Sequence, residues 1–118
     1  MSIHIIDQKI VYAQLKQFAD ENYGTMIKGV VDVERKILAL GGELHADAEA
    51  GLLKEGSKQK NLWGFNIHIN TSKEERVEYF SFINIRPSDG NHSMIIQSEQ
   101  LKAKIKQIVD SLIGWEDE

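Results

Sequence analysis

Residues 41–49, GGELHADAE in one-letter code, carry the side chains best suited to chemistry. The polar members alternate with small or apolar residues and are Glu43, His45, Asp47 and Glu49. In an extended chain these side chains would point to one side and reach a common ligand. Histidine and carboxylates bind divalent metals, and a histidine beside a carboxylate can act as a general base. We predict Glu43, His45 and Asp47 as catalytic residues. The predicted metal ligands are His45, Asp47 and Glu49.

A purely structural interpretation of the same residues stays open. Their spacing differs from the H-E-x-x-H spacing of helical metalloprotease sites. The alanines and leucines that follow favour a short helix from about Ala46 to Glu55, closed by Gly56. Asp47 and Glu49 would then be first-turn carboxylates favoured by the helix dipole, and the neighbouring histidine a capping or partly exposed side chain.

A second group of polar residues follows the most apolar run of the chain. Asn84 and Arg86 share a face at the end of that run, and Asn91 and Ser93 lie in the next loop. Loops at strand ends often carry ligand sites, and the planar guanidinium of arginine suits carboxylates and phosphates. We predict these four residues as a cofactor-binding or ligand-binding set. Alternatively, Arg86 pairs with an acidic residue of the segment 41–49 and only holds the loop.

Composition limits the classes of function. The 118 residues suffice for one domain with one core, and 42% apolar with 27% charged residues indicates a globular chain. A net charge of −4 makes nucleic-acid binding unlikely by electrostatics, because such binding draws most of its affinity from basic surfaces. Cysteine is absent, which removes thiol chemistry and fits a cytoplasmic protein. We find no signal peptide, membrane-spanning run, nucleotide-binding glycine loop or hydrolase elbow, so we predict no membrane partner.

The elements that would position these residues form one α+β domain over residues 1–118. Alternating apolar residues predict strands over 26–33, 36–40 and about 63–70, and a short strand is expected over 3–6 at a sheet edge. Residues 77–85 are apolar on both faces, which predicts a central strand ended by Pro87. A helix through residues 25–40 is the alternative to the hairpin there, and Gly29 disfavours it. Helical spacing predicts main helices over 11–22 and from Ser98 to Gly114.

The predicted arrangement is a sheet of four or five mostly antiparallel strands. The two main helices pack on one face, and the short third helix lies at one end of the sheet. Residues 115–118 are expected to form a frayed acidic tail. No repeat, linker or low-complexity tract divides the chain.

The chain resembles an uncharacterised family of short, mostly bacterial proteins, a domain of unknown function. The resemblance rests on the motifs GGExHADAE, GSxQ, LWGxN and INIRPxxGN, which begin at Gly41, Gly56, Leu62 and Ile83. It covers most of the chain. The family often has a basic residue after the Gly–Asn pair, where this chain has His92. The resemblance implies no activity.

These observations favour a polar site in which Glu43, His45 and Asp47 face Asn84 and Arg86. Such a site could bind a divalent metal ion or a small anionic ligand and could support hydrolysis, so whether the protein is an enzyme stays open. The alternative is a non-catalytic interaction module, such as an antitoxin-like partner of another protein, in which the same residues hold loops. The site requires His45 and Arg86 to share a cleft, within about 10 Å of one another.

Overall fold

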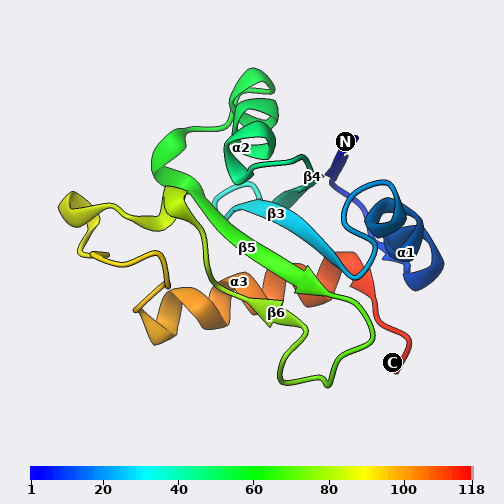
Figure 1. The fold of residues 1–118 in the computed structure, drawn as a ribbon. Coiled ribbons are helices and arrows are strands. Elements are labelled where there is room, and N and C mark those ends of the chain that lie inside the picture. The colour runs from blue at the N-terminus through cyan, green and yellow to red at the C-terminus, as the bar shows by residue number, and fades with distance from the viewer. Residues whose placement is uncertain (118) are drawn as a thin grey trace.

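The computed structural model describes residues 1–117, and within them the chain forms one five-stranded antiparallel sheet (Figure 1). The strand order is β1-β4-β3-β5-β6, with β1 and β6 at the edges. The bounds are β1 Ile3–Ile6, β3 Met26–Asp32, β4 Ile37–Gly41, β5 Leu62–His68 and β6 Val77–Glu78. A separate parallel pair joins β2 (Ile10–Val11) to β7 (Ile113–Gly114).

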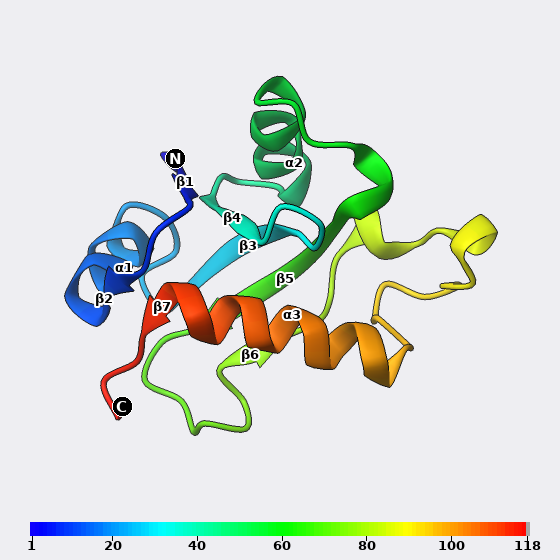
Figure 2. The same ribbon diagram turned by 180° about the vertical axis from the view of Figure 1, so that it is seen from behind.

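Helices cover both faces of this sheet. The helices are α1 Tyr12–Asp20, α2 His45–Lys54 and α3 Glu99–Leu112, with short 3₁₀ turns at Gln59–Asn61, Phe82–Asn84 and Pro87–Asp89. Seen from behind, α1 and α3 lie across one face (Figure 2), and their apolar residues share one core cluster with Leu38, Phe65 and Ile67 of the sheet. The prediction of two main helices on one face is therefore confirmed. No helix within residues 1–117 has the length and apolar character needed to span a bilayer.

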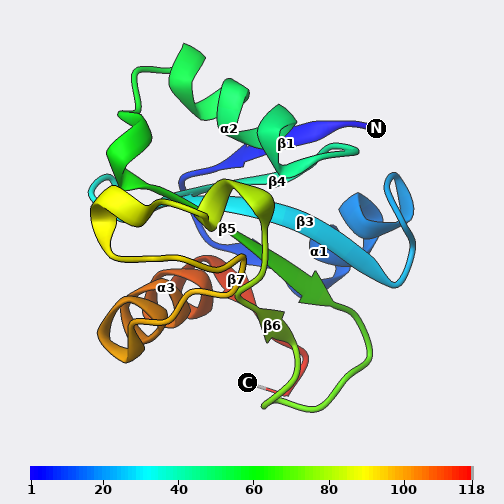
Figure 3. The ribbon, with the colours of Figure 1, turned by 60° about the vertical axis from the view of Figure 1, so that its left-hand side comes forward.

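The short helix α2 was expected at one end of the sheet, and that expectation is wrong. Figure 3 shows the sheet between α2 and α3. Ala48 and Leu52 of α2 pack in a second apolar cluster with Val30, Ala39 and Leu62 of the strands. The small side chains at positions 30 and 39 let the helix approach that face. We call this side of the sheet the α2 face.

The β3–β4 hairpin is formed as predicted, and the helical alternative for residues 25–40 is excluded. Asp32 is fully buried, and its Oδ1 accepts hydrogen bonds of 2.9 Å from the backbone N–H groups of Glu34 and Arg35. Lys36 takes a positive φ of 58° to complete the turn. The predicted edge strand β1 and the Ser98 cap of α3 are also confirmed, the cap by a 3.1 Å bond from the Leu101 N–H to Ser98 Oγ.

The prediction of a central strand over residues 77–85 is wrong. The strand β6 holds only Val77 and Glu78, and it lies at the edge of the sheet. The apolar run beyond it is not enclosed on two faces, because the Phe82 side chain is 79% exposed. The chain instead bends into the 3₁₀ turn that ends at the buried Asn84.

The acidic tail predicted over residues 115–118 ends at Glu118, which lies outside the described residues. Trp115 is packed against the core with 8% of its surface exposed. Asp117 forms an ion pair of 2.7 Å with Arg76, from the loop that precedes β6.

Candidate functional site

A pocket of about 440 Å³ opens where the N-terminal end of α2 meets the α2 face of the sheet. Small-molecule sites commonly have volumes of about 300–1,000 Å³. We call it the α2 pocket. Its polar lining consists of Lys28, His45, Asn66, Glu78 and Ser81. Its apolar lining includes Leu44, Phe80, Phe82 and Ile83. The combination of an apolar wall with a few polar groups is typical of sites for small organic molecules.

Three of the polar residues form a row across the sheet. Lys28 on β3 is the register partner of Asn66 on β5, and Asn66 is the partner of Glu78 on β6. Side chains of directly paired residues lie on the same face, with Cβ atoms about 4.5–5.5 Å apart. Lys28 is two residues before Val30, which packs under α2, so the row lies on the α2 face. The sheet therefore presents an ammonium, an amide and a carboxylate in that order.

His45 enters this pocket from the first position of α2. Its side chain is buried, with Nε2 2.9 Å from the backbone oxygen of Phe65. Because a carbonyl oxygen only accepts hydrogen bonds, Nε2 carries the proton and donates. In the neutral ring Nδ1 is then an unprotonated acceptor. Burial lowers the pKa of His45, outweighing the bond to Phe65 and the neighbouring Asn66 and Glu78 side chains, which act in the opposite direction. The imidazole is therefore a neutral acceptor at pH 7.

Asn66 and Glu78 form the polar floor of the α2 pocket. Asn66 is 5% exposed, and its Nδ2 donates to Glu78 Oε1 at 3.0 Å and to the Phe80 carbonyl at 3.3 Å. Its Oδ1 is buried without a hydrogen-bond donor from residues 1–117. His68 Nε2 lies 2.9 Å from the same Glu78 Oε1. The bond to His68 is the main reason for the lowered pKa of Glu78, so this carboxylate stays ionised at pH 7.

The other residues of the segment 41–49 lie outside the α2 pocket. Asp47 Oδ2 accepts a 2.9 Å bond from the Leu44 N–H and so caps α2. Glu43 is exposed, and Glu49 projects from the second turn of α2. The alternation ends where α2 begins, so these side chains diverge. Within residues 1–117 no three histidine or acidic side chains are placed to hold one metal ion, so the predicted set with His45 is not assembled.

The predicted ligand residues of the second group bond to the chain's own backbone. Asn84 accepts from the Gly64 N–H at 2.8 Å and donates to the Gly64 and Met94 carbonyls at 3.0 and 3.2 Å. Asn91 Nδ2 donates to three carbonyl oxygens, and its Oδ1 accepts from a backbone N–H. Ser93 Oγ accepts from the Ile95 N–H at 3.1 Å. These bonds fix the loop after the 3₁₀ turn and point none of the three residues at the α2 pocket.

Arg86 also holds the loop rather than facing His45. Its guanidinium lies 3.6 Å from the centre of the Trp63 ring and donates to the Gln59 and Leu62 carbonyls at 2.9 and 2.7 Å. Within residues 1–117 its ion-pair partner is Asp89, at 3.7 Å, and Glu49 of the segment 41–49 also favours the charged guanidinium electrostatically. The α2 pocket is lined by His45 and by neither Arg86 nor Asn84, so the predicted facing sets do not share that cleft.

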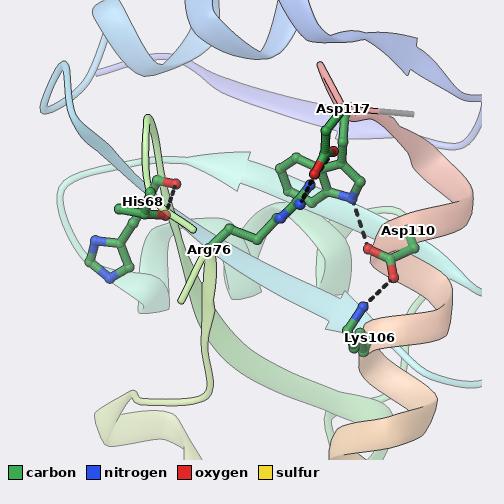
Figure 4. A network of polar contacts seen from close by, with 7 residues as sticks. His68, Arg76, Lys106, Asp110 and Asp117 are labelled. Atoms are coloured by element: carbon green, nitrogen blue, oxygen red, sulfur yellow. Dashed lines mark hydrogen bonds and ion pairs between the residues drawn. The ribbon is translucent and has the colours of Figure 1, made fainter. Parts of the chain in front are cut away.

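A smaller pocket of about 210 Å³ lies near the C-terminus, and Figure 4 shows its polar network. Arg76 makes two bonds to the Asp117 carboxylate, at 2.7 and 3.2 Å, and lies 4.5 Å from the Trp115 ring centre. The Trp115 Nε1–H donates to Asp110, which also pairs with Lys106 (Figure 4). These charges satisfy one another and tie the C-terminal segment to the sheet. The α2 pocket is therefore the stronger candidate.

The pH dependence of stability should reveal the buried His45. A histidine whose pKa is lowered by folding binds fewer protons in the native state than in the unfolded state. Its stabilising contribution is complete above the unfolded pKa of about 6.5 and is lost as pH falls toward the native value. We expect the free energy of unfolding, measured in urea, to fall from pH 7 to pH 5 in the wild type and less steeply in His45→Gln.

The control for this measurement is His92→Gln, because His92 is exposed. Within residues 1–117 the carboxyl groups with lowered pKa values are Glu21, Glu78 and Asp117. Carboxyl groups of this kind lose their stabilising contribution below about pH 4.5, outside the measured window. Equal slopes for wild type and His45→Gln between pH 7 and pH 5 would contradict a buried neutral imidazole.

Comparisons with known proteins agree with the resemblance noted in the sequence. No curated protein and no solved structure was found to match the chain. One family model matches residues 4–112, and the family is described as protein of unknown function, DUF5674. Because this match covers nearly the whole chain, the protein belongs to the DUF5674 family.

Proposed function

We propose that the protein binds a small organic molecule in the α2 pocket, with His45 as the central polar contact. The observation that carries this proposal is the state of His45: a buried, neutral ring whose Nε2–H is fixed by the Phe65 carbonyl. Such a ring offers Nδ1 as a pre-oriented acceptor. A volume of about 440 Å³ and the apolar side chains of Phe80 and Phe82 supply room and contact area for an organic ligand.

The proposal keeps one residue of the set predicted from sequence and gives the others different roles. His45 stays as a ligand contact, while Asp47 caps α2 and Asn84 and Arg86 hold the wall of the pocket. We propose an organic ligand in preference to a metal ion, since the carboxylates of residues 43–49 diverge from the histidine. If the ligand carries a hydrolysable bond, the residue of the α2 pocket that would act as general base is His45, through Nδ1.

NMR titration tests the proposal. The probes are benzoate, phenol, indole, benzylamine, hexanoate and hexylamine, each added to ¹⁵N-labelled protein. We expect at least one probe to shift the amide signals of Leu44, Ala46, Asn66 and Phe82, which line the α2 pocket. For probes with an N–H or O–H donor, the apparent affinity should fall at least about tenfold in His45→Gln, because a lost hydrogen bond to a buried acceptor costs about 1–3 kcal/mol.

His92→Gln serves as the matched control and should bind the probes as the wild type does. Two results would count against the proposal. In one, no probe shifts the four pocket amides. In the other, the probes that carry an N–H or O–H donor and shift these amides bind His45→Gln and wild type equally.

A second candidate function is a contact with another protein, as in the interaction module considered above. The segment after β6 exposes large apolar side chains, with Phe82 79%, Ile95 53% and Ile85 42% exposed. Exposed apolar side chains that gather on one segment can mark an interaction surface. If the partner is a second copy of the chain, sedimentation velocity should show association that rises with concentration and is lost in Phe82→Ser. A monomer at all concentrations would remove this form of the candidate.

A further inference from the structure

We propose that the ligand of the α2 pocket is a small zwitterion of the α-amino-acid kind with an apolar side chain. This inference rests on the proposed function and adds the chemical class of the ligand. It follows from the order of charges on the floor of the pocket, where Lys28 and Glu78 stand on either side of Asn66.

The ammonium of Lys28 is available to an anionic group. Within residues 1–117 no carboxylate lies within 4.0 Å of its Nζ, and the Tyr23 ring is 5.7 Å from it. Lys28 and the first residues of α2 both line the pocket. The first backbone N–H groups of a helix carry a partial positive charge and favour anions. The Leu44 N–H is bound to Asp47 Oδ2 and the Asp47 N–H to the Leu44 carbonyl, which leaves the N–H groups of His45 and Ala46 for an anion. A ligand carboxylate would therefore be favoured at this end.

The opposite end of the floor favours a cationic donor. Glu78 receives both of its hydrogen bonds, from Asn66 and His68, on Oε1, so Oε2 keeps its lone pairs. His45 contributes Nδ1, and Asn66 contributes a buried Oδ1 that lacks a donor. An ammonium group has three N–H donors and no acceptor, and the three residues that carry these acceptors all line the pocket.

The row across the strands places two opposite charges on one face of the sheet. Two steps of about 4.5–5.5 Å place the Cβ atoms of Lys28 and Glu78 roughly 10 Å apart. The two charged side chains rise from the same face at these positions, so a ligand that carries both an ammonium and a carboxylate can pair with both of them at once. The ligand's side chain would then lie against Phe80, Phe82 and Ile83.

Electrostatics argues against a ligand with a single charge. A simple anion at Lys28 would also meet the carboxylate of Glu78, and a simple cation at Glu78 would also meet Lys28. Like charges at close range disfavour binding, whereas a zwitterion pairs with both groups.

The test compares ligands that share an apolar body and differ only in charge. The first series is L-phenylalanine, 3-phenylpropionate and 2-phenylethylamine; the second is L-leucine, 4-methylpentanoate and 3-methylbutylamine. Isothermal titration and ¹⁵N NMR give the affinity and the location of binding. We expect one of the two amino acids to bind at the pocket amides at least about tenfold more tightly than both of its analogues, since each removed charge loses one charge-assisted bond.

Two charge variants sharpen the test. Lys28→Met keeps the length of the side chain and should erase the advantage of the amino acid over the amine. Glu78→Gln should erase its advantage over the acid. The matched controls Lys54→Met and Glu55→Gln change exposed charges at the far end of α2 and should leave the order of affinities intact.

The possible failures are distinguishable. Tighter or equal binding of an acid or an amine at the pocket amides would overturn the zwitterion while supporting an organic ligand in the α2 pocket. Absence of binding by all six compounds would also overturn the zwitterion. The wider panel of probes, read with His45→Gln, then decides the proposed function separately.

Discussion

Replacing Asn84 with alanine is expected to lower the free energy of unfolding by about 3–5 kcal/mol. Asn84 is fully buried, and its side chain pairs with both backbone groups of Gly64 and with the Met94 carbonyl. Each hydrogen bond contributes about 1 kcal/mol net, but a buried partner left unpaired costs about 1–3 kcal/mol. Alanine would leave the N–H and C=O of Gly64 without partners in the interior of the fold, so several such costs add.

Urea denaturation monitored by tryptophan fluorescence measures this loss. Asn84→Asp is the informative companion, because it keeps the Oδ1 acceptor and replaces the donor by a charge facing two carbonyl oxygens. It should be destabilised as much as the alanine variant at pH 7. Asn61→Ala, at a partly exposed position, is the control and should change stability by less than about 0.5 kcal/mol. A loss below 1 kcal/mol in Asn84→Ala would contradict the role given to this side chain.

The effect should extend to the α2 pocket. Asn84 takes the place of a strand partner for β5 at Gly64, where β6 has already ended. The preceding Ser81 approaches so closely that a Cβ on Gly64 would lie 2.5 Å from the Ser81 Cβ. Asn84 and Gly64 therefore hold the segment 80–83, the apolar wall of the pocket, against the sheet. Binding of any ligand that uses this wall should weaken in Asn84→Ala variants that remain folded.

The sequence predicted those elements whose hydrophobic pattern is local. The β3–β4 hairpin and the three helices follow from alternation, helical spacing and the cap at Ser98. The segment after β6 could not be predicted in the same way. Its apolar residues suggested a central strand, but its course depends on Asn84 and Asn91, whose side chains bond to backbone groups far away in sequence or across the loop. No period in the sequence encodes such pairs.

The candidate site was predicted only in part for a related reason. His45 stood out by its residue type, and the structure places it in a pocket. Lys28 and Asn66 also carried a signal, since both occupy polar positions of predicted strands. Whether they lie beside Glu78 depends on the order of the strands and on their register. A single sequence determines neither the order nor the register. For Asp47, the structural interpretation predicted its role as a first-turn carboxylate of α2, whereas the interpretation as a catalytic or metal-binding residue did not.

The paired glycines that open GGELHADAE lead to the second large effect, the loss of stability in Gly41→Ala. Gly41 ends β4 with φ of +113°, and an added Cβ would lie 2.0 Å from the backbone oxygen of Ser2. A backbone atom cannot rotate away as a side chain can, so the N-terminal strand would have to shift. We expect the free energy of unfolding to fall by at least about 3 kcal/mol. This exceeds the cost of about 1–2 kcal/mol for a non-glycine residue in a left-handed backbone conformation.

Gly56→Ala separates these two contributions. Gly56 has a similar φ of +100°, yet nothing lies within 4 Å of the position its Cβ would take. It should therefore lose only the conformational part, about 1–2 kcal/mol. Equal losses in the two variants would show that the approach of Ser2 is unimportant.

Hydrogen exchange should locate the damage in Gly41→Ala. Ile3 pairs with Gly41, and β1 is held in the sheet by β4 alone. Displacing Ser2 would therefore loosen the whole edge strand, and the amides of Ile3–Ile6 should exchange faster. The exchange of the β5 amides should slow or quicken only as much as the change in global stability requires. Because α2 begins four residues after Gly41, the same shift should reach His45, and probe binding at the α2 pocket should weaken in Gly41→Ala and persist in Gly56→Ala.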